Sequence, residues 1–308
     1  KKIKIKKIQN IFQFENQIKK NVLNCLYDLR LAYHFQNKEI FQLLSKYGAS
    51  YLIRPGVGRG IVISSKKKQK YLIFKLKKII DKNFFNLKNV ILNKFFLLFI
   101  PRFWSINKAK YVYLIGKYDY LNKEKHKLVG NQTRLIWGQH RNYDDNLREY
   151  NQKLKIHKKE KKALFIDQAV PYHPDAIELD LGQDDRLASV NPDEYYNSIR
   201  IFLEKLNKKF GYKIEISCHP RLAVQKLKKF FPRFAIKISK TIQQIRSSSL
   251  IIMHESTAID YVVMYNKPII FITNNSLNNA DYPHSDEISS AAKSFNKKCI
   301  NIDINSIS

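Results

Sequence analysis

Short apolar runs, each ending at a polar turn, recur along the second half of this 308-residue chain. The clearest is Leu250–Met253, in which apolar side chains follow one another without alternating with polar ones. Such runs are typical of strands buried on both faces, which occur in parallel sheets covered by helices. We expect strands at 163–166, 212–217, 234–236, 250–253, 268–272 and 299–302.

The segments between these runs have helical character. Asn191 is a suitable N-cap, Pro192 suits the first helical position, and acidic residues follow in the first turn. This pattern predicts a helix to about Phe210 with its apolar residues on one face. Shorter helices are expected around 226–230, over 239–247 and over 258–265. Alternating strands and helices predict an α/β domain with a parallel sheet.

The first half is expected to be of the same kind. Helical patterns occupy 18–29 and 38–46, and strands are expected at 50–53, 61–64, 95–100, 111–115 and 134–137. A lysine-rich stretch over 151–162 loses its apolar periodicity and is the natural linker. We therefore expect two α/β domains, a basic one over 1–155 and a second one over 156–308.

The two halves differ in charge. Residues 1–160 have 36 Lys and Arg against 10 Asp and Glu, a net of +26, whereas residues 161–308 have 20 against 16, a net of +4. An AT-rich genome favours lysine, but it acts on both halves and does not explain the difference. A basic half attracts an anionic lipid surface, an acidic glycan or nucleic acid, and a solvated lysine-rich surface is the alternative.

Several classes of protein are disfavoured. The cysteines are Cys25, Cys218 and Cys299, too few and too scattered for a disulfide framework, which fits a reducing compartment. No stretch reaches the roughly 20 apolar residues of a membrane span. Zinc-finger spacing, an RNA-recognition signature and basic-region heptads are all lacking, so no nucleic-acid partner is expected. We expect a cytoplasmic protein with peripheral contact at the inner face of the membrane.

Polar side chains follow the strands of the second half, where ligands bind to open parallel sheets. They fall at the carboxyl ends of successive strands: Asp167, His219 with Arg221, His254 with Glu255, and Ser256 with Thr257. A histidine in a turn can donate to a phosphate oxygen, and hydroxyls near a helix start can join backbone N–H groups around an anion. Each group alone fits an ordinary turn or cap, but their coincidence at one edge favours a site.

Asp167 has a separate set of interpretations. A carboxylate at the end of a buried strand can be a general base, a nucleophile at an electrophilic carbon, or an acidic cap of the next turn. Position alone does not choose between them. Other motifs are weaker: the glycines of 56–60 lack the dinucleotide fingerprint, and Asp184 and Asp185 have no further ligand at metal-binding spacing.

The C-terminal half resembles the donor domain of GT-B glycosyltransferases that use CMP-activated sugars, namely bacterial sialyltransferases and the Kdo transferases of capsule and lipopolysaccharide assembly. The segments that carry the resemblance are Phe165–Pro174, Cys218–Arg221 and Ser248–Ala258, with a further likeness over Trp137–Asp145. The acidic-acidic-glycine motif of many bacterial sialyltransferases is not evident, which favours the Kdo-transferase side.

The resemblance implies two Rossmann-like domains whose parallel sheets face a central cleft. It makes 1–155 the acceptor-side domain and 156–308 the nucleotide-sugar-binding domain. It makes Asp167 the catalytic carboxylate, acting on the anomeric carbon or on the acceptor hydroxyl. The residues implied to hold the donor phosphate are His219, Pro220, Arg221, His254, Glu255, Ser256 and Thr257. Those implied on the acceptor side or in the cleft are His140, Tyr143, Asp144 and His173.

The resemblance also implies the substrates. The donor is a CMP-activated ulosonic acid such as Kdo or a sialic-type sugar, and the acceptor is an anionic or lipid-linked surface glycan. No metal or other cofactor is expected, because cationic side chains can neutralise the single leaving phosphate. Two alternatives remain: a CDP-polyol phosphotransferase of the teichoic-acid type, and a non-catalytic basic scaffold of GT-B shape.

Overall fold

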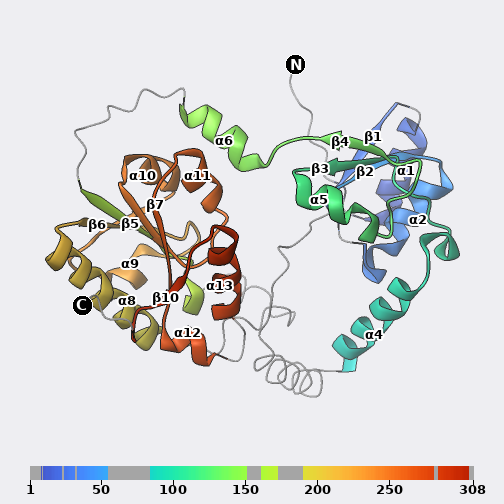
Figure 1. The fold of residues 1–308 in the computed structure, drawn as a ribbon. Coiled ribbons are helices and arrows are strands. Elements are labelled where there is room, and N and C mark those ends of the chain that lie inside the picture. The colour runs from blue at the N-terminus through green and yellow to red at the C-terminus, as the bar shows by residue number, and fades with distance from the viewer. Residues whose placement is uncertain are drawn as a thin grey trace. The chain divides into compact units, whose positions relative to one another are not determined.

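Two parallel β-sheets organise the part of the chain that the computed structural model describes, residues 8, 10–22, 24–31, 33–54, 84–150, 161–172, 190–280 and 284–304. Contacts divide these residues into two units, which meet in the sequence between His140 and Arg141 (Figure 1). The prediction of an α/β fold with two parallel sheets is therefore confirmed. The domain boundary expected at 155/156 lies outside the described residues.

The first unit has a four-stranded sheet in the order β1-β2-β3-β4, with every neighbouring pair parallel. Its strands are β1 (Leu26–Leu29), β2 (Ser50–Ile53), β3 (Tyr111–Leu114) and β4 (Arg134–Trp137). Its helices are α1 (Ile11–Asn21), α2 (Lys38–Lys46), α4 (Phe84–Leu98) and α5 (Lys117–Asn122), with 3-10 turns η1 (Phe35–Asn37), η2 (Pro101–Trp104) and η3 (Lys123–Lys125). Phe41, Leu44, Tyr51, Phe96 and Leu114 form the centre of its core.

The second unit has a six-stranded parallel sheet in the order β10-β9-β8-β5-β6-β7. Its strands are β5 (Lys162–Ile166), β6 (Lys213–Cys218), β7 (Ala235–Ile238), β8 (Leu250–Met253), β9 (Ile269–Thr273) and β10 (Cys299–Asn301). Its helices are α6 (Arg141–Tyr150), α8 (Pro192–Phe210), α9 (Val224–Lys228), α10 (Thr241–Ser247), α11 (Ile259–Met264), α12 (Asn275–Asn279) and α13 (His284–Ser294), with the 3-10 turn η4 (Val170–Tyr172).

The strand order of the second sheet is that of a Rossmann fold. The chain leaves β5 toward β6 and β7, then returns past β5 to β8 and continues outward to β10. Figure 1 shows α8 on one side of this sheet and α10 with α11 on the other. The order of strands therefore reverses between β5 and β8, which makes this the topological switch point of the sheet.

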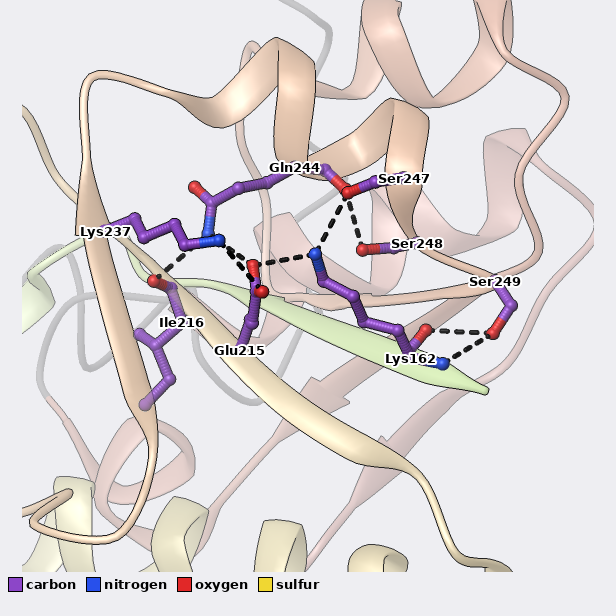
Figure 2. Close-up of polar contacts among 8 residues, drawn as sticks. All are labelled: Lys162, Glu215, Ile216, Lys237, Gln244, Ser247, Ser248 and Ser249. Carbon is purple, nitrogen blue, oxygen red and sulfur yellow. Dashed lines mark hydrogen bonds and ion pairs between the residues drawn. The ribbon is translucent and has the colours of Figure 1, made fainter. Parts of the chain in front are cut away.

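A polar network fixes the amino ends of β5 and β6 (Figure 2). Lys162 Nζ lies 2.8 Å from a carboxylate oxygen of Glu215, and both side chains are buried. Glu215 also pairs with Lys237 Nζ at 3.0 Å and accepts a hydrogen bond from Gln244 of α10. Burial alone raises the pKa of Glu215, but the two lysines outweigh it and lower the pKa below its ordinary value. The network therefore ties three neighbouring strands to α10.

The start of α8 confirms the predicted cap. The Asn191 side chain accepts from the backbone N–H groups of Asp193 and Glu194, and Pro192 occupies the first turn. Gly211 ends the helix with φ of 66°, a left-handed conformation that glycine adopts without a Cβ clash. Tyr195, Tyr196 and Ile199 lie on the buried face, so the helix presents aromatic residues to the sheet.

Two predictions for the first unit are wrong. The run 95–100 is not a strand; α4 extends from Phe84 to Leu98, because apolar residues at helical spacing continue N-terminal to the run. The helix expected over 18–29 is instead α1, which ends at Asn21 before β1. Asn10 caps α1 by accepting from Gln13 N–H, so the helix begins at Ile11, seven residues earlier than expected. The expected strand at 61–64 lies outside the described residues.

Within the described ranges, none of the helices combines the length and apolar character that crossing a bilayer requires.

The Lys162–Glu215 pair allows a stability prediction. Lys162→Met leaves a buried carboxylate with one fewer cation, so we expect the free energy of unfolding to fall by about 3 kcal/mol. Lys162→Met combined with Glu215→Met removes both charges and recovers most of that loss. Urea unfolding followed by circular dichroism measures both variants. Lys237→Met removes the other cation of Glu215, at a lysine whose side chain is 44% exposed, and is the matched control that is expected to cost less.

The buried pair would lose its assigned role if the double variant were as unstable as the sum of the two single variants. That outcome would mean that each side chain stabilises the unit independently of the other.

Candidate functional site

The carboxyl ends of β5 and β8 bring Asp167 and His254 to the switch point. Ile166 is paired with Ser217 of β6 on one side and with Met253 of β8 on the other. One residue further along, Asp167 follows β5, Cys218 ends β6 and His254 follows β8. The residues that the sequence singled out at three strand ends therefore come together at one edge of the sheet.

Asp167 lies beneath this edge, with only 3% of its surface exposed. Its Oδ1 accepts a hydrogen bond from the Ala169 backbone N–H at 3.0 Å. Its Oδ2 faces the Tyr196 hydroxyl at 3.5 Å, which is long for an O–H···O hydrogen bond. One carboxylate oxygen is thus held firmly, and the other has only a weak partner.

The environment of Asp167 favours the protonated acid. Burial raises its pKa from 3.8 to about 7, against the lowering effect of the bonds from Ala169 and Tyr196. Within the described part of the chain, no cationic side chain bonds to either carboxylate oxygen. Asp167 therefore exchanges its proton near neutral pH, which is the property required of a general acid or base.

The turn after Asp167 is tight and strained. Ala169 has φ of 53°, a left-handed conformation that is unfavourable for a residue with a Cβ. The Asp167 carboxylate holds this turn through the Ala169 N–H, and Gln168 Oε1 accepts from the Glu255 N–H at 3.2 Å. The Gln168 side chain thus links the turn after β5 to the backbone after β8, across the switch point.

His254 is fully buried beside Tyr195, with their ring centroids 5.5 Å apart. Its Nδ1 lies 2.6 Å from the Ile272 carbonyl oxygen, so Nδ1 carries the proton and donates. Burial, with a smaller contribution from nearby His284, lowers its pKa from 6.5 to about 4 despite that hydrogen bond. The ring is therefore neutral at pH 7, and its Nε2 is a buried acceptor without a partner among the described residues.

His219 and Arg221 form a turn directly after β6. The His219 carbonyl accepts from the Leu222 N–H at 3.0 Å, and the His219 Nδ1 accepts from the Arg221 N–H at 3.3 Å. In the neutral ring this arrangement puts the proton on Nε2, which becomes a donor. Pro220 and Arg221 are exposed and His219 is half-buried, so this turn presents cationic and N–H groups at the sheet edge.

Ser256 and Thr257 belong to the turn between β8 and α11. The helix begins at Ile259, and Ser256 Oγ accepts from the Ala258 N–H at 3.2 Å. Asn142 of α6, which the sequence reasoning did not assign a role, contacts this turn: its Nδ2 donates to the Thr257 carbonyl and to Asp260, both at 2.9 Å. Its position between His140 and Tyr143 in the segment that carried the resemblance was the only available signal.

The residues predicted on the acceptor side or in the cleft are not all in the same unit. Tyr143 and Asp144 lie exposed in the first turn of α6, next to Asn142. His140 ends the first unit and is exposed, whereas His173 lies outside the described residues. The structure thus places Tyr143 and Asp144, but not His140, in the unit that contains Asp167.

The first unit has its own polar network at the carboxyl ends of its strands. Arg54 after β2 makes a two-pronged ion pair with Asp28 of β1, at 2.9 and 2.7 Å. Its guanidinium also lies 4.5 Å from the ring centre of Tyr113 of β3, whose hydroxyl donates to the Gln139 carbonyl. A Cβ at Gly138 would collide with the Tyr113 hydroxyl, so glycine is required for this close approach.

A hollow lies elsewhere in the first unit, near the amino ends of β2 and β3. Glu15, Lys46, Arg102 and Asn107 are among its lining residues. None of the predicted site residues lines it, so it is separate from the carboxyl-edge networks.

Across the described ranges, His, Cys, Asp and Glu side chains do not gather in groups of three or more at metal-binding distance. Comparison with models of known protein families and with curated proteins gives no match.

The raised pKa of Asp167 leads to a prediction on stability. The unfolded carboxyl ionises near 3.8 and the folded one near 7, so the folded state is stabilised below pH 4 and loses that stabilisation as pH rises to 7. Asp167→Asn cannot ionise and avoids this loss. We expect its stability relative to the native chain to increase between pH 4 and 7, by up to about 4 kcal/mol, and to stay constant above.

Urea unfolding at a series of pH values measures this difference. Curves for the native chain and for Asp167→Asn that stay parallel from pH 4 to 7 would show that Asp167 ionises normally in the folded protein.

Proposed function

We propose that this chain is a glycosyltransferase of the GT-B type that transfers a ulosonic acid, such as Kdo or a sialic-type sugar, from its CMP-activated form to a surface-glycan acceptor. The observation that carries the proposal is the convergence of Asp167, the His219–Arg221 turn and the 254–257 turn at the switch point of a Rossmann-ordered sheet. Nucleotides bind to sheets of this order at that point.

The donor's phosphate is assigned to the turns after β6 and β8. His219 Nε2–H and the Arg221 guanidinium supply a hydrogen-bond donor and a positive charge for a phosphate oxygen. As the bond between the anomeric carbon and the phosphate oxygen breaks, CMP leaves with both bonding electrons. Positive groups placed at that oxygen stabilise the developing charge, which is the principal requirement of this reaction.

Asp167 is assigned as the general base. The acceptor hydroxyl replaces Tyr196 at Oδ2, gives its proton to the carboxylate, and its oxygen forms the new bond to the anomeric carbon. The products are the extended glycan, CMP and the proton on Asp167, which is later released to water. A pKa of about 7 suits this role, because the base is substantially ionised at neutral pH and still binds the proton well.

His254 is assigned a positioning role. Its fully buried neutral ring donates to the Ile272 carbonyl and cannot donate to phosphate from Nε2 in that tautomer. It packs against Phe165 and Tyr195, the neighbours of Asp167 in the core. It therefore holds the residues around Asp167 in place by packing against them.

The acceptor is assigned to the basic first unit. Arg54 and Tyr113 lie at the carboxyl ends of its strands, and the rings of Tyr120 and Trp137 stack 5.6 Å apart with both side chains exposed. An exposed aromatic pair can pack against the apolar face of a sugar ring, and the surplus of Lys and Arg attracts an anionic glycan.

Nucleotide binding tests the donor. Thermal unfolding is measured with CMP, CDP, UDP and GDP, each at about 100 times a plausible dissociation constant. A bound nucleotide then stabilises the fold by about 2.7 kcal/mol, which raises the unfolding temperature by a few degrees. We expect the shift with CMP, and we expect His219→Ala to abolish it. His34→Ala, at an exposed histidine of the first unit, is the matched control and should keep the shift.

Each other outcome points elsewhere. A larger shift with CDP would favour polyol-phosphate transfer, and one with UDP or GDP an ordinary hexosyltransferase. A chain that responds to none of the four nucleotides would be better described as a non-catalytic scaffold.

The role of Asp167 is tested by transfer from a CMP-sugar. Asp167→Asn keeps an oxygen that can accept from the Ala169 N–H but removes the base, so we expect transfer to fall by roughly 10²–10⁴-fold while CMP still stabilises the fold. Asp193→Asn, at an exposed carboxylate on α8, should leave transfer unchanged. Full transfer by Asp167→Asn would remove Asp167 from the chemistry and leave it as the residue that holds the Ala169 turn.

A further inference from the structure

Helix α4 has two apolar faces, and among the described residues of its unit only one of these faces is covered. Phe96 is fully buried against Tyr33, Phe35 and Trp104. Ile91, Phe95 and Leu98 have helical spacing of four and three residues, lie on another face and are exposed, Leu98 by 75%. The apolar face continues past the helix through Ile100 and Phe103, the latter 60% exposed. We call these five residues the α4–η2 surface.

The aromatic rings of this surface are held in place. Phe99 stacks on Phe103 with centroids 4.4 Å apart, and Phe95 contacts Phe99 at 4.9 Å. Phe103 also packs edge-to-face on Trp104, whose indole N–H donates to the Phe96 carbonyl. Large apolar side chains are therefore fixed in an exposed position, so a partner that covers them orders few additional side chains on binding.

The segment that carries this surface is basic. Between Asp81 and Asp119 the sequence has no Asp or Glu, but it has seven Lys and Arg. Lys88 and Lys94 are exposed and lie about 60° to either side of the apolar face, given 3.6 residues per turn. Arg102 is exposed on η2 between Ile100 and Phe103. A basic border around an apolar centre complements lipid headgroups with negative charge above acyl chains.

A second copy of this chain fits the surface less well. Two copies that meet here would bring Lys88, Lys94 and Arg102 of each against the same residues of the other, and like charges across an interface oppose association. A bilayer surface supplies negative charge at the border and apolar contact at the centre.

From these observations we propose that the α4–η2 surface inserts into the interface of an anionic lipid bilayer. Ile91, Phe95, Leu98, Ile100 and Phe103 enter the boundary between headgroups and acyl chains, and Lys88, Lys94 and Arg102 contact the headgroup phosphates. This inference does not rest on the proposed function, because it concerns lipid alone and needs neither nucleotide nor acceptor.

Sedimentation with vesicles tests it. The full chain is mixed with vesicles of phosphatidylcholine alone or of phosphatidylcholine and phosphatidylglycerol in equal amounts. We expect binding to the mixed vesicles that weakens as salt is added and is at least about tenfold weaker with phosphatidylcholine alone. Leu98→Ser combined with Phe103→Ser preserves every charge and should weaken binding to the mixed vesicles by about tenfold or more.

The matched control is Leu121→Ser with Val263→Ser, which removes two apolar side chains of similar exposure, 66% and 57%, from other helices. It should bind as the native chain does, and thermal unfolding of all variants checks that each folds. Trp104 gives a second readout: Trp137→Phe leaves it as the only tryptophan, and its fluorescence should shift to shorter wavelength with mixed vesicles.

Three outcomes would overturn the proposal. The first is no binding to mixed vesicles. The second is equal loss of binding in the surface variant and in its control, which would leave only general electrostatic attraction. The third is a native dimer that Leu98→Ser with Phe103→Ser converts to a monomer, which would make this surface a contact between copies. CMP binding is measured independently, so failure here leaves the proposed function standing.

Discussion

The position of β5 at the centre of the second sheet is the constraint on which this unit depends. The strand has neighbours on both sides and is buried along its whole length, yet it begins at Lys162 and ends next to Asp167, two residues that carry charge in water. A buried charge requires either a partner or a change in pKa. At the amino end of β5, Lys162 has a charged partner, Glu215. At the carboxyl end, the pKa of Asp167 is raised instead.

The two ends therefore serve different purposes. At the amino end, the Glu215 carboxylate pairs with Lys162 and Lys237 and accepts a hydrogen bond from Gln244, which stabilises the sheet. At the carboxyl end, Asp167 bonds to no cation of the described residues, Ala169 has a left-handed backbone, and His254 Nε2 is an acceptor without a partner there. Proteins commonly tolerate such unfavourable features where the same groups are used for binding or catalysis.

The sequence predicted the second unit better than the first for a physical reason. The strand Leu250–Met253 has the bounds that the sequence predicts. A short, wholly apolar run between two helices is typical of a strand buried on both faces of a parallel sheet. The run 95–100 is also wholly apolar, but it lies at the end of a longer helical pattern and has one exposed face. Composition does not separate these cases, because exposure of an apolar face depends on what covers it.

The candidate site was partly predictable for a related reason. In a parallel sheet, every residue that follows a strand lies at the same edge, so strand positions alone bring Asp167, His219 and His254 together. The burial of Asp167, the tautomer of His254 and the contact of Asn142 with Thr257 depend on packing between segments far apart in the sequence. The sequence pattern does not contain this information. These three features nevertheless decide which role each residue can have in the site.

Hydrogen–deuterium exchange with and without CMP tests the central claim, that a nucleotide binds at the carboxyl edge of the second sheet. The account predicts slower exchange on CMP addition at the amides of Ala169, Arg221, Leu222 and Glu255, and unchanged exchange at Ser248 and Ser249 on the opposite edge. Protection confined to the opposite edge or to the first unit, or no protection at any amide, would contradict it.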